Sequence, residues 1–312
     1  MANASQAARA AGNTGPAAPA RPAAAAAAAT APTPDSSEGI FRLLEILQSA
    51  LTSDGVVDEF GFDPEFTTRL LLPLLRPLYR SWFRIDVEGA EHVPERGSGL
   101  VVSNHAGAIA VDAVMTQVAA HDALPTPRHL RMLAADLVFK VPVLADIATR
   151  AGHVRASVPT AQTLLSRGEL VGVWPEGFKG VGKPFHKRYQ LQRFGRGGFV
   201  AVALRTGAPL IPTAIVGSEE IYPIIGDAKG LARLFDLPYF PITPSFPWLG
   251  PLGLIPLPSK WTIRFGEPIQ TRSYGAQAAD DPAVVFALAD LVRDRIQQML
   301  IDMLMHRTSV FQ

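Results

Sequence analysis

The sequence predicts an α/β fold in which a mostly parallel or mixed sheet is flanked by helices. From about residue 84, short apolar runs typical of strands alternate with longer stretches of helical periodicity. Apolar residues make up 48% of the 312 residues, which is enough for a substantial core. The final helix has the clearest start, because Asp281 suits an N-cap, Pro282 suits the first turn, and 283–305 is periodic.

The other elements are expected in the following order along the chain. Strands are predicted at 84–89, 99–104, 128–133, 170–174, 209–217 and 261–266. Helices are predicted at 108–121, 136–150, 159–167 and 196–206. No internal repeat and no second boundary interrupts this alternation, so 84–312 is expected to form one domain.

Residues 1–38 have a different composition. Ala and Pro dominate, seven consecutive Ala occupy 23–29, and Leu, Ile, Val and aromatic residues are missing. Such a segment cannot bury a core, so it is predicted to be a disordered tail. Pro22 and the lack of large aliphatic side chains also argue against a secretion signal.

Residues 39–83 are predicted to be an amphipathic helical segment at a membrane interface. A short amphipathic helix is expected at 39–51, and a basic one at 65–84. The basic residues of the second helix share one face at helical spacing: Arg69, Arg76, Arg80 and Arg84. Pro73 and Pro77 are expected to kink or split it. A basic helix with aromatic residues is typical of membrane surfaces, although an ordinary covering helix with exposed Arg is the alternative.

A run of 23 uncharged residues, 237–259, contains seven prolines and therefore cannot be a spanning helix. Four aromatic residues lie among the prolines. Two interpretations remain open. The segment is either a loop that enters a bilayer interface, where aromatic side chains are favourable, or a Pro-rich excursion that covers the core.

The stretch VVSNHAGAIAVDAVM, 101–115, contains the first candidate for chemistry. His105 follows a predicted strand at the edge where open α/β sheets place their sites, and Asp112 lies on the next helix. A histidine oriented by a carboxylate is a general base near neutral pH. On one straight helix the two residues would lie about 10.5 Å apart along the axis. A dyad therefore requires His105 in a turn, a break at Gly107, and a helix that starts near Ala108 or later.

The stretch WPEGFKGVGKPF, 174–185, begins like a nucleotide-binding loop, with Gly177 to Lys183 reading G-x-x-x-x-G-K. Pro184 replaces the Ser or Thr that would ligate Mg²⁺, so this interpretation is rejected. The segment 179–196 carries six cationic residues and no acid, which suits a phosphate-bearing substrate. The alternative is an exposed loop with solvated charges.

Several other chemistries are not indicated. The chain has no cysteine, no G-x-S-x-G motif, no H-E-x-x-H motif, and no metal-ligand spacing among its other histidines. The net charge of +1 gives no general attraction to nucleic acid, so no nucleic-acid partner is expected.

Three segments in order resemble the lysophospholipid acyltransferase family, which includes the bacterial 1-acylglycerol-3-phosphate acyltransferases: NHAGAIAVD, WPEGFKG and PLIPTAIVG. The resemblance covers about 84–270. The first segment resembles the family's His and Asp block. Trp174 to Gly177 resemble its Phe-Pro-Glu-Gly block, and Ile211 with Pro212 resemble its apolar block.

The sequence departs from the family pattern at three points. His105 and Asp112 have six residues between them instead of four, as in the branch that resembles mono- and diacylglycerol acyltransferases. Gly152 and Arg155 are one residue closer than the family's Gly-x-x-x-Arg. Lys179 stands where an Arg usually follows. The acceptor, whether phosphorylated or neutral, is therefore left open, as are the acyl chain length and the oligomeric state.

The resemblance implies a glycerolipid acyltransferase-like fold and acyl transfer from acyl-CoA or an acyl carrier protein to a glycerolipid hydroxyl. It implies His105 as general base with Asp112 orienting it, no metal or other cofactor, and a peripheral position on the cytoplasmic face of a membrane. It also implies that Glu176 and Gly177 shape the acceptor side. The basic residues expected to bind substrate are Lys179, Lys183, Arg188, Arg193 and Arg196. The alternatives are a lipid esterase and a non-catalytic peripheral lipid-binding protein.

Overall fold

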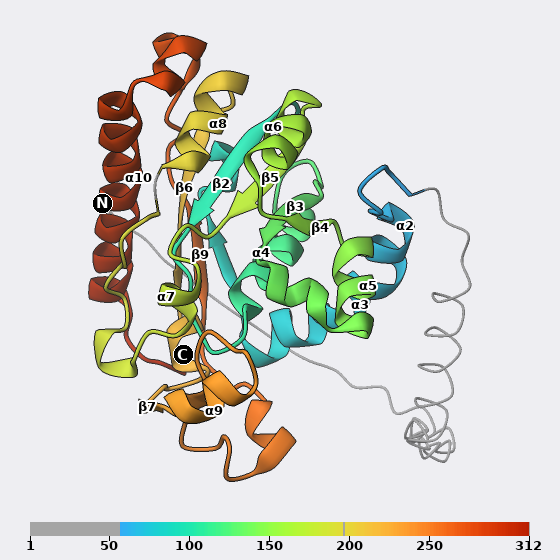
Figure 1. Cartoon of the computed structure of the whole chain (residues 1–312), viewed down its shortest axis with the longest axis vertical. Coiled ribbons are helices and arrows are strands. Elements are labelled where there is room, and N and C mark those ends of the chain that lie inside the picture. The colour runs from blue at the N-terminus through green and yellow to red at the C-terminus, as the bar shows by residue number, and fades with distance from the viewer. Residues whose placement is uncertain (1–56, 196, 312) are drawn as a thin grey trace, which may run out of the picture. The chain divides into compact units, whose positions relative to one another are not determined.

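The computed structural model describes residues 57–195 and 197–311, so the tail and the 39–51 helix lie outside the described residues. Its centre is a seven-stranded sheet of order β1-β9-β6-β2-β5-β3-β4 (Figure 1). The strands are β1 Asp86–Glu88, β2 Gly99–Ser103, β3 Leu130–Ala134, β4 His153–Arg155, β5 Leu170–Val173, β6 Leu210–Val216 and β9 Thr262–Phe265. Strand β9 runs antiparallel to β6, and β1 is parallel to β9. All other pairs are parallel, so the predicted mixed sheet is confirmed.

Helices cover both faces of the sheet, because alternate residues of each strand point to opposite sides. Leu100 and Val102 of β2 pack with helices α6, α8 and α10, whereas Val101 packs with α4. These helices are α4 Val111–Asp122, α6 Val158–Ser166, α8 Gly198–Thr206 and α10 Pro282–His306. In Figure 1, α10 runs alongside β6 and α8.

Most predicted elements are present, with differences that have local causes. The predicted helix 136–150 is divided into a 3-10 turn, Asp136–Lys140, and α5, Pro142–Arg150, because Pro142 starts a new helix. Strand β4 was not predicted, since its three residues are too few for a visible alternation. Two short helices were also missed: α7 Phe178–Val181 and α9 Lys229–Leu234.

The basic helix predicted at 65–84 extends over 64–82. It consists of α2 Pro64–Phe66, a π-helical turn Thr67–Leu71, α3 Leu72–Pro77 and a second π-helical turn Leu78–Trp82. The backbone stays in the right-handed helical region at each junction, so of the two expectations, a kink or a split at the prolines, the split does not occur; π-helical turns flank the α-helical turn that contains the prolines. Leu72, Tyr79 and Phe83 are buried in the core that α4 shares, so this helix packs on the same core as the sheet.

The arginines of the stripe on this helix are paired with carboxylates, and of the three Arg76 is the one that is mostly buried. Arg76 donates from Nε and Nη2 to the two carboxylate oxygens of Asp122 on α4, each at 2.7 Å, and Arg80 adds a contact at 3.4 Å. Arg69 pairs with Glu65. Arg84 lies beyond the helix at a φ of 46°, so it does not belong to the stripe. These contacts favour the covering-helix alternative.

The Pro-rich segment 237–259 adopts irregular structure outside the main sheet. It contains β8 Pro241–Ile242, which pairs with β7 Gly226–Asp227, and a 3-10 turn Gly250–Leu254. Thr243 is buried, whereas the apolar side chains at the tip are exposed. We call the following residues the apolar surface: Leu234, Phe235, Trp248, Leu249, Leu252 and Ile255. In Figure 1 this part lies with α9 at the lower end. Among the described helices, none combines the length and apolarity needed to cross a bilayer.

Candidate active site

Three neighbouring parallel strands, β5, β2 and β6, end at the same edge of the sheet. Glu176 follows β5, His105 follows β2, and Glu219 follows β6. Polar groups on three separate loops are therefore brought to the carboxyl edge of the sheet, where open α/β folds form their sites.

Asn104 fixes the backbone immediately before His105. Its Nδ2 donates to the carbonyl of Ile215 at 3.0 Å, and its Oδ1 accepts from the Ile215 N–H at 2.8 Å. The amide of this fully buried side chain thus replaces the backbone hydrogen bonds of one residue between β2 and β6. These two hydrogen bonds fix the backbone position from which His105 leaves the sheet.

His105 and Asp112 form a direct hydrogen bond. Nδ1 of His105 lies 2.8 Å from Oδ2 of Asp112, whose side chain is fully buried. His105 lies in the turn after β2, Gly107 has a φ of +81°, and α4 begins at Val111. The predicted dyad geometry is therefore confirmed. With its Nδ1–H donated to the carboxylate, the imidazole has its lone pair on Nε2.

The carboxylate of Asp112 also shapes the turn. Its Oδ2 accepts from the Ala106 N–H at 2.9 Å, and its Oδ1 accepts from the Ala113 N–H at 2.8 Å. One side chain thus orients the imidazole and closes the loop that carries it, so the two functions are coupled in any substitution at this position.

Glu176 holds His105 from the opposite side. Its Oε1 accepts from the His105 N–H at 2.9 Å, and its Oε2 accepts from the Gln192 N–H at 2.6 Å. The residue is 4% exposed, so both oxygens are committed inside the protein. Glu176 therefore fixes the backbone of His105, and its expected role on the acceptor side stays a prediction.

Close packing leaves little room behind the histidine. A Cβ on Gly180 would lie 2.8 Å from the Cβ of His105 and 2.8 Å from the Cβ of Glu176. Gly177 has a φ of 55° and a ψ of −141°, an unusual backbone conformation, and its N–H donates to the carbonyl of Trp174 at 3.0 Å. Gly180 thus allows close packing against His105, and Gly177 allows the unusual backbone conformation beside it.

Comparisons with known proteins give a family match and relatives. A family model described as acyltransferase matches residues 84–216. An uncharacterized protein of Mycobacterium tuberculosis is 54% identical over 277 residues, covering 89% of this chain and 77% of the relative. An uncharacterized protein of Mycobacterium leprae is 54% identical over 265 residues, covering 85% and 72%.

The chain contains an acyltransferase-family domain, because the family model matches residues 84–216. A solved structure supports the same fold, namely the 1-acyl-sn-glycerophosphate (LPA) acyltransferase PlsC from Thermotoga maritima. The two share 18% identity with a TM-score of 0.51, and the match covers 86% of this chain and 90% of that chain.

The basic residues predicted to bind substrate divide into two groups in this acyltransferase. Lys179, Arg188 and Arg193 are exposed, and the guanidinium of Arg188 lies 4.5 Å from the ring centroid of Phe185. Lys183 is different, because its side chain is 2% exposed and its Nζ lies 3.1 Å from Oε1 of Glu219. The prediction that Lys183 meets a phosphate is therefore wrong. Arg196 lies outside the described residues.

Tyr239 of the Pro-rich segment contacts the loop between His105 and α4. It was not predicted as a site residue. Its hydroxyl donates to the carbonyl of Ala108 at 2.8 Å, and its ring lies close to Gly182. Burial raises the pKa of Tyr239 well above its usual range, and the nearby Asp112 charge adds to this shift. The 131 positions between its sequence number and that of Ala108 hide this contact from sequence patterns.

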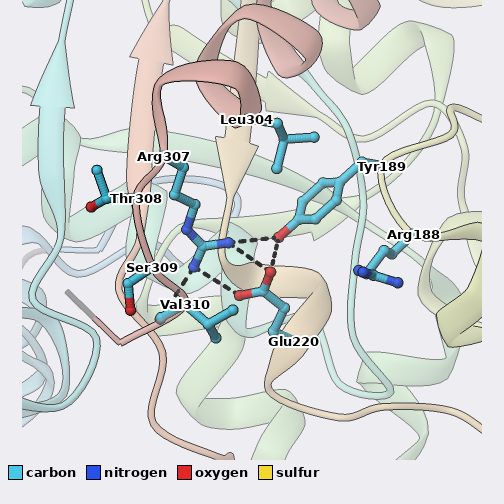
Figure 2. Close-up of a pocket in the computed structure, with 8 residues that line it drawn as sticks. All are labelled: Arg188, Tyr189, Glu220, Leu304, Arg307, Thr308, Ser309 and Val310. Carbon is cyan, nitrogen blue, oxygen red and sulfur yellow. Dashed lines mark hydrogen bonds and ion pairs between the residues drawn. The ribbon is translucent and has the colours of Figure 1, made fainter.

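A cavity of about 490 Å³ lies near the end of α10 and does not include the dyad (Figure 2). Its polar centre is Glu220, which accepts from Arg307 at 2.6 and 2.8 Å and from the Tyr189 hydroxyl at 2.8 Å. The other lining residues are Arg188, Leu304, Thr308, Ser309 and Val310. Its central charges therefore satisfy one another.

Proposed function

We propose that this acyltransferase moves a fatty acyl group from acyl-CoA or an acyl carrier protein to a glycerolipid hydroxyl. The observation that carries the proposal is the 2.8 Å hydrogen bond between His105 and buried Asp112 at the carboxyl edge of the sheet. The imidazole is 13% exposed, so an incoming hydroxyl can reach it.

In the proposed reaction, Nε2 of His105 removes the proton from the acceptor hydroxyl as its oxygen attacks the thioester carbonyl. A C–O bond forms, the C–S bond breaks, and the thiolate receives the proton from the imidazolium. Asp112 holds the tautomer and stabilises the imidazolium. A positioned base of this kind contributes about 10²- to 10⁴-fold to the rate. No covalent intermediate on the protein is required.

The oxyanion of the tetrahedral intermediate needs a hydrogen-bond donor near His105. The backbone N–H groups of His105 and Ala106 already donate to carboxylates, and that of Gly177 donates to Trp174. Within the described residues, the N–H of Gly107 has no hydrogen-bond partner. Gly107 is therefore the proposed donor among the glycines flanking the site.

The proposed phosphate contacts lie on the basic segment. Lys179, Arg188 and Arg193 are exposed, and none of them is in an ion pair with another described residue. Free cations of this kind suit the phosphate of a phosphorylated acceptor or the phosphates of CoA.

Peripheral attachment to a membrane on its cytoplasmic face is proposed to use the apolar surface. Trp248, Leu249, Leu252 and Ile255 are 71%, 60%, 67% and 54% exposed. They belong to a run of 23 residues without a charge, so insertion of this run into the bilayer interface buries no charged side chain of its own. Tyr239 connects the same segment to the loop that carries His105.

The test is an acceptor screen with a labelled acyl-CoA, comparing wild type with His105→Ala. Transfer of label to a lysophospholipid or a neutral glycerolipid, lost in His105→Ala, supports the proposal and identifies the acceptor. Release of free fatty acid without any acceptor product would indicate a lipid esterase. Vesicle binding unaffected by His105→Ala, without any turnover, would indicate a lipid-binding protein.

A further inference from the structure

A buried ion bridge spans the end of β2 behind His105. Nζ of Lys183 lies 3.1 Å from Oε1 of Glu219, which follows β6, and 3.5 Å from Oε2 of Glu176, which follows β5. The side chains of the three residues are 2%, 5% and 0% exposed. One ammonium group thus faces two carboxylates in a region that excludes water.

The bridge contains one cationic group, Lys183, and two carboxyl groups, Glu176 and Glu219. Burial raises the pKa of Glu219 to about 7, the Lys183 ammonium and a backbone hydrogen bond from Tyr189 oppose the rise, and the Glu176 charge adds to it. Without Lys183, two buried carboxylates would remain with no cation between them. Such a pair cannot stay fully ionised near neutral pH.

Glu176 must be ionised to do what the geometry requires. Its two oxygens accept one backbone N–H each, from His105 and from Gln192. A protonated carboxyl group carries a hydrogen on one oxygen, which would conflict with one of the two donors. A Cβ at Gly180 would lie 2.8 Å from the Cβ atoms of both His105 and Glu176, so the three backbones pack closely here.

We propose that Lys183 is a positioning residue, which holds the Glu176 carboxylate and thereby keeps His105 in its reactive place. This inference rests on the proposed role of His105 as the base. Lys183 acts through Glu176 and does not touch substrate.

Anchoring of the neighbouring turn does not explain the bridge. The 3-10 turn Ser218–Glu220 is already held at Glu220, which Arg307 and the Tyr189 hydroxyl contact (Figure 2). Ser259 also donates from Oγ to the carbonyl of Gly217 at 2.9 Å. What Lys183 adds is the contact with Glu176, and through it the link to His105.

The first test compares the pH dependence of kcat for wild type and Lys183→Met, with KM measured for both substrates. Loss of a positioning contact is expected to lower kcat about tenfold or more at pH 7, while each KM changes by less than about threefold. The variant should also gain a new rising limb above neutral pH, because the two carboxylates, left without a cation between them, titrate as a coupled pair and are both ionised only as the pH increases. Unchanged kcat with no new limb would overturn the proposal.

Two further variants separate positioning from general destabilisation. In Lys183→Met/Glu219→Gln, the repulsion between the carboxylates is gone, so the new limb should move to lower pH than in the single variant. Removal of a second member of a purely structural bridge would not restore activity in this way. Arg150→Met removes the cation from another buried pair, with Asp63, and should lower Tm without moving the pH profile.

The outcomes also distinguish this inference from the proposed function. If His105→Ala retains activity, the role of His105 is wrong regardless of Lys183. If His105→Ala is inactive and Lys183→Met is normal, only the positioning role is wrong. Should Lys183→Met not fold, Glu176→Gln gives the second measurement, because Gln keeps the size of Glu but only one acceptor oxygen. A lowered kcat at constant KM is then expected, and an unchanged kcat would overturn the inference.

Discussion

Nδ1 of His105 and Oδ2 of Asp112 are within 2.8 Å although seven positions separate the two residues. The chain achieves this by turning at Gly107 and starting α4 only at Val111, so that Asp112 in its first turn faces back towards the strand. The separation along a straight helix would have been about 10.5 Å.

Asp112→Asn is expected to reduce kcat by about 10²- to 10⁴-fold, because the amide favours the wrong imidazole tautomer. The sheet and helices should persist, as judged by far-UV circular dichroism, whereas the turn at Ala106 also loses part of its anchor. The measurement is kcat with a saturating acyl donor. Asp302→Asn, at an exposed carboxylate that pairs with Arg264, is the matched control and should retain normal turnover. A near-normal rate for Asp112→Asn would refute the dyad.

Gly180→Ala is expected to impair catalysis more than stability. The new methyl group would lie 2.8 Å from the Cβ of His105 and 3.0 Å from its carbonyl oxygen, so the loop must move. A displacement of the base should lower kcat by about 10²-fold. Gly230→Ala on α9 is the control, because its Cβ would meet nothing within 4 Å. Equal kcat values for the two variants would show that the contact is unimportant.

Arg188→Ala and Arg193→Ala should raise KM for a phosphorylated acceptor or for acyl-CoA. Each cation is exposed, so the free energy of unfolding should change by less than about 0.5 kcal/mol. Steady-state kinetics with each substrate varied in turn provides the measurement. Arg205→Ala, which removes an exposed pair with Asp280, serves as control. Unchanged KM for both substrates would favour the exposed-loop alternative.

Trp248→Ser and Leu252→Ser should each weaken binding to phospholipid vesicles about tenfold, because each removes an apolar side chain worth about 1.5 to 3 kcal/mol on burial. Sedimentation with anionic vesicles gives the bound fraction. Because Arg76 and Arg80 are paired with Asp122, mild detergent should release the protein more effectively than salt. Met305→Ser, at a residue 77% exposed on α10, should bind normally. Equal losses in all three variants would exclude a specific surface.

Asp122→Asn should destabilise the protein in a way that depends on pH. The hydrogen bond from Arg76 lowers the pKa of Asp122 to about 2, below its ordinary value of 3.8. A lowered pKa adds stability above 3.8 that disappears as the pH falls towards 2. Urea unfolding should therefore show a difference of about 1–2 kcal/mol from wild type at neutral pH, shrinking in acid. A pH-independent difference would contradict this. Asp136→Asn, from an exposed pair with Arg155, should have little effect.

Local chemistry explains why much of the site was predictable. Strands β2, β5 and β6 are buried apolar runs, which are recognisable because strands covered on both faces carry few polar residues. The His105 turn followed from helix geometry alone, since a dyad at this spacing excludes one continuous helix.

Pairings between distant residues explain what sequence reasoning missed. Lys183 belongs to a basic segment without acids. Its partner Glu219 lies 36 positions away and contacts it only in the folded chain. Arg76 and Asp122 are 46 positions apart, so a correct helical spacing suggested a surface stripe where an internal ion pair exists. Periodicity reports the face of a helix but not what that face meets.

The outermost strand pair has a consequence for how the chain folds. Strand β1 pairs only with β9 within the sheet, and its Glu88 lies 176 positions from its register partner Arg264. Phe83, just before β1, stacks on Trp261 with ring centroids 4.4 Å apart. During synthesis, β1 therefore has no partner until most of the protein has been made. Closing so long a loop is entropically costly, so this edge should assemble late, and fragments that end before Trp261 should leave β1 unfolded.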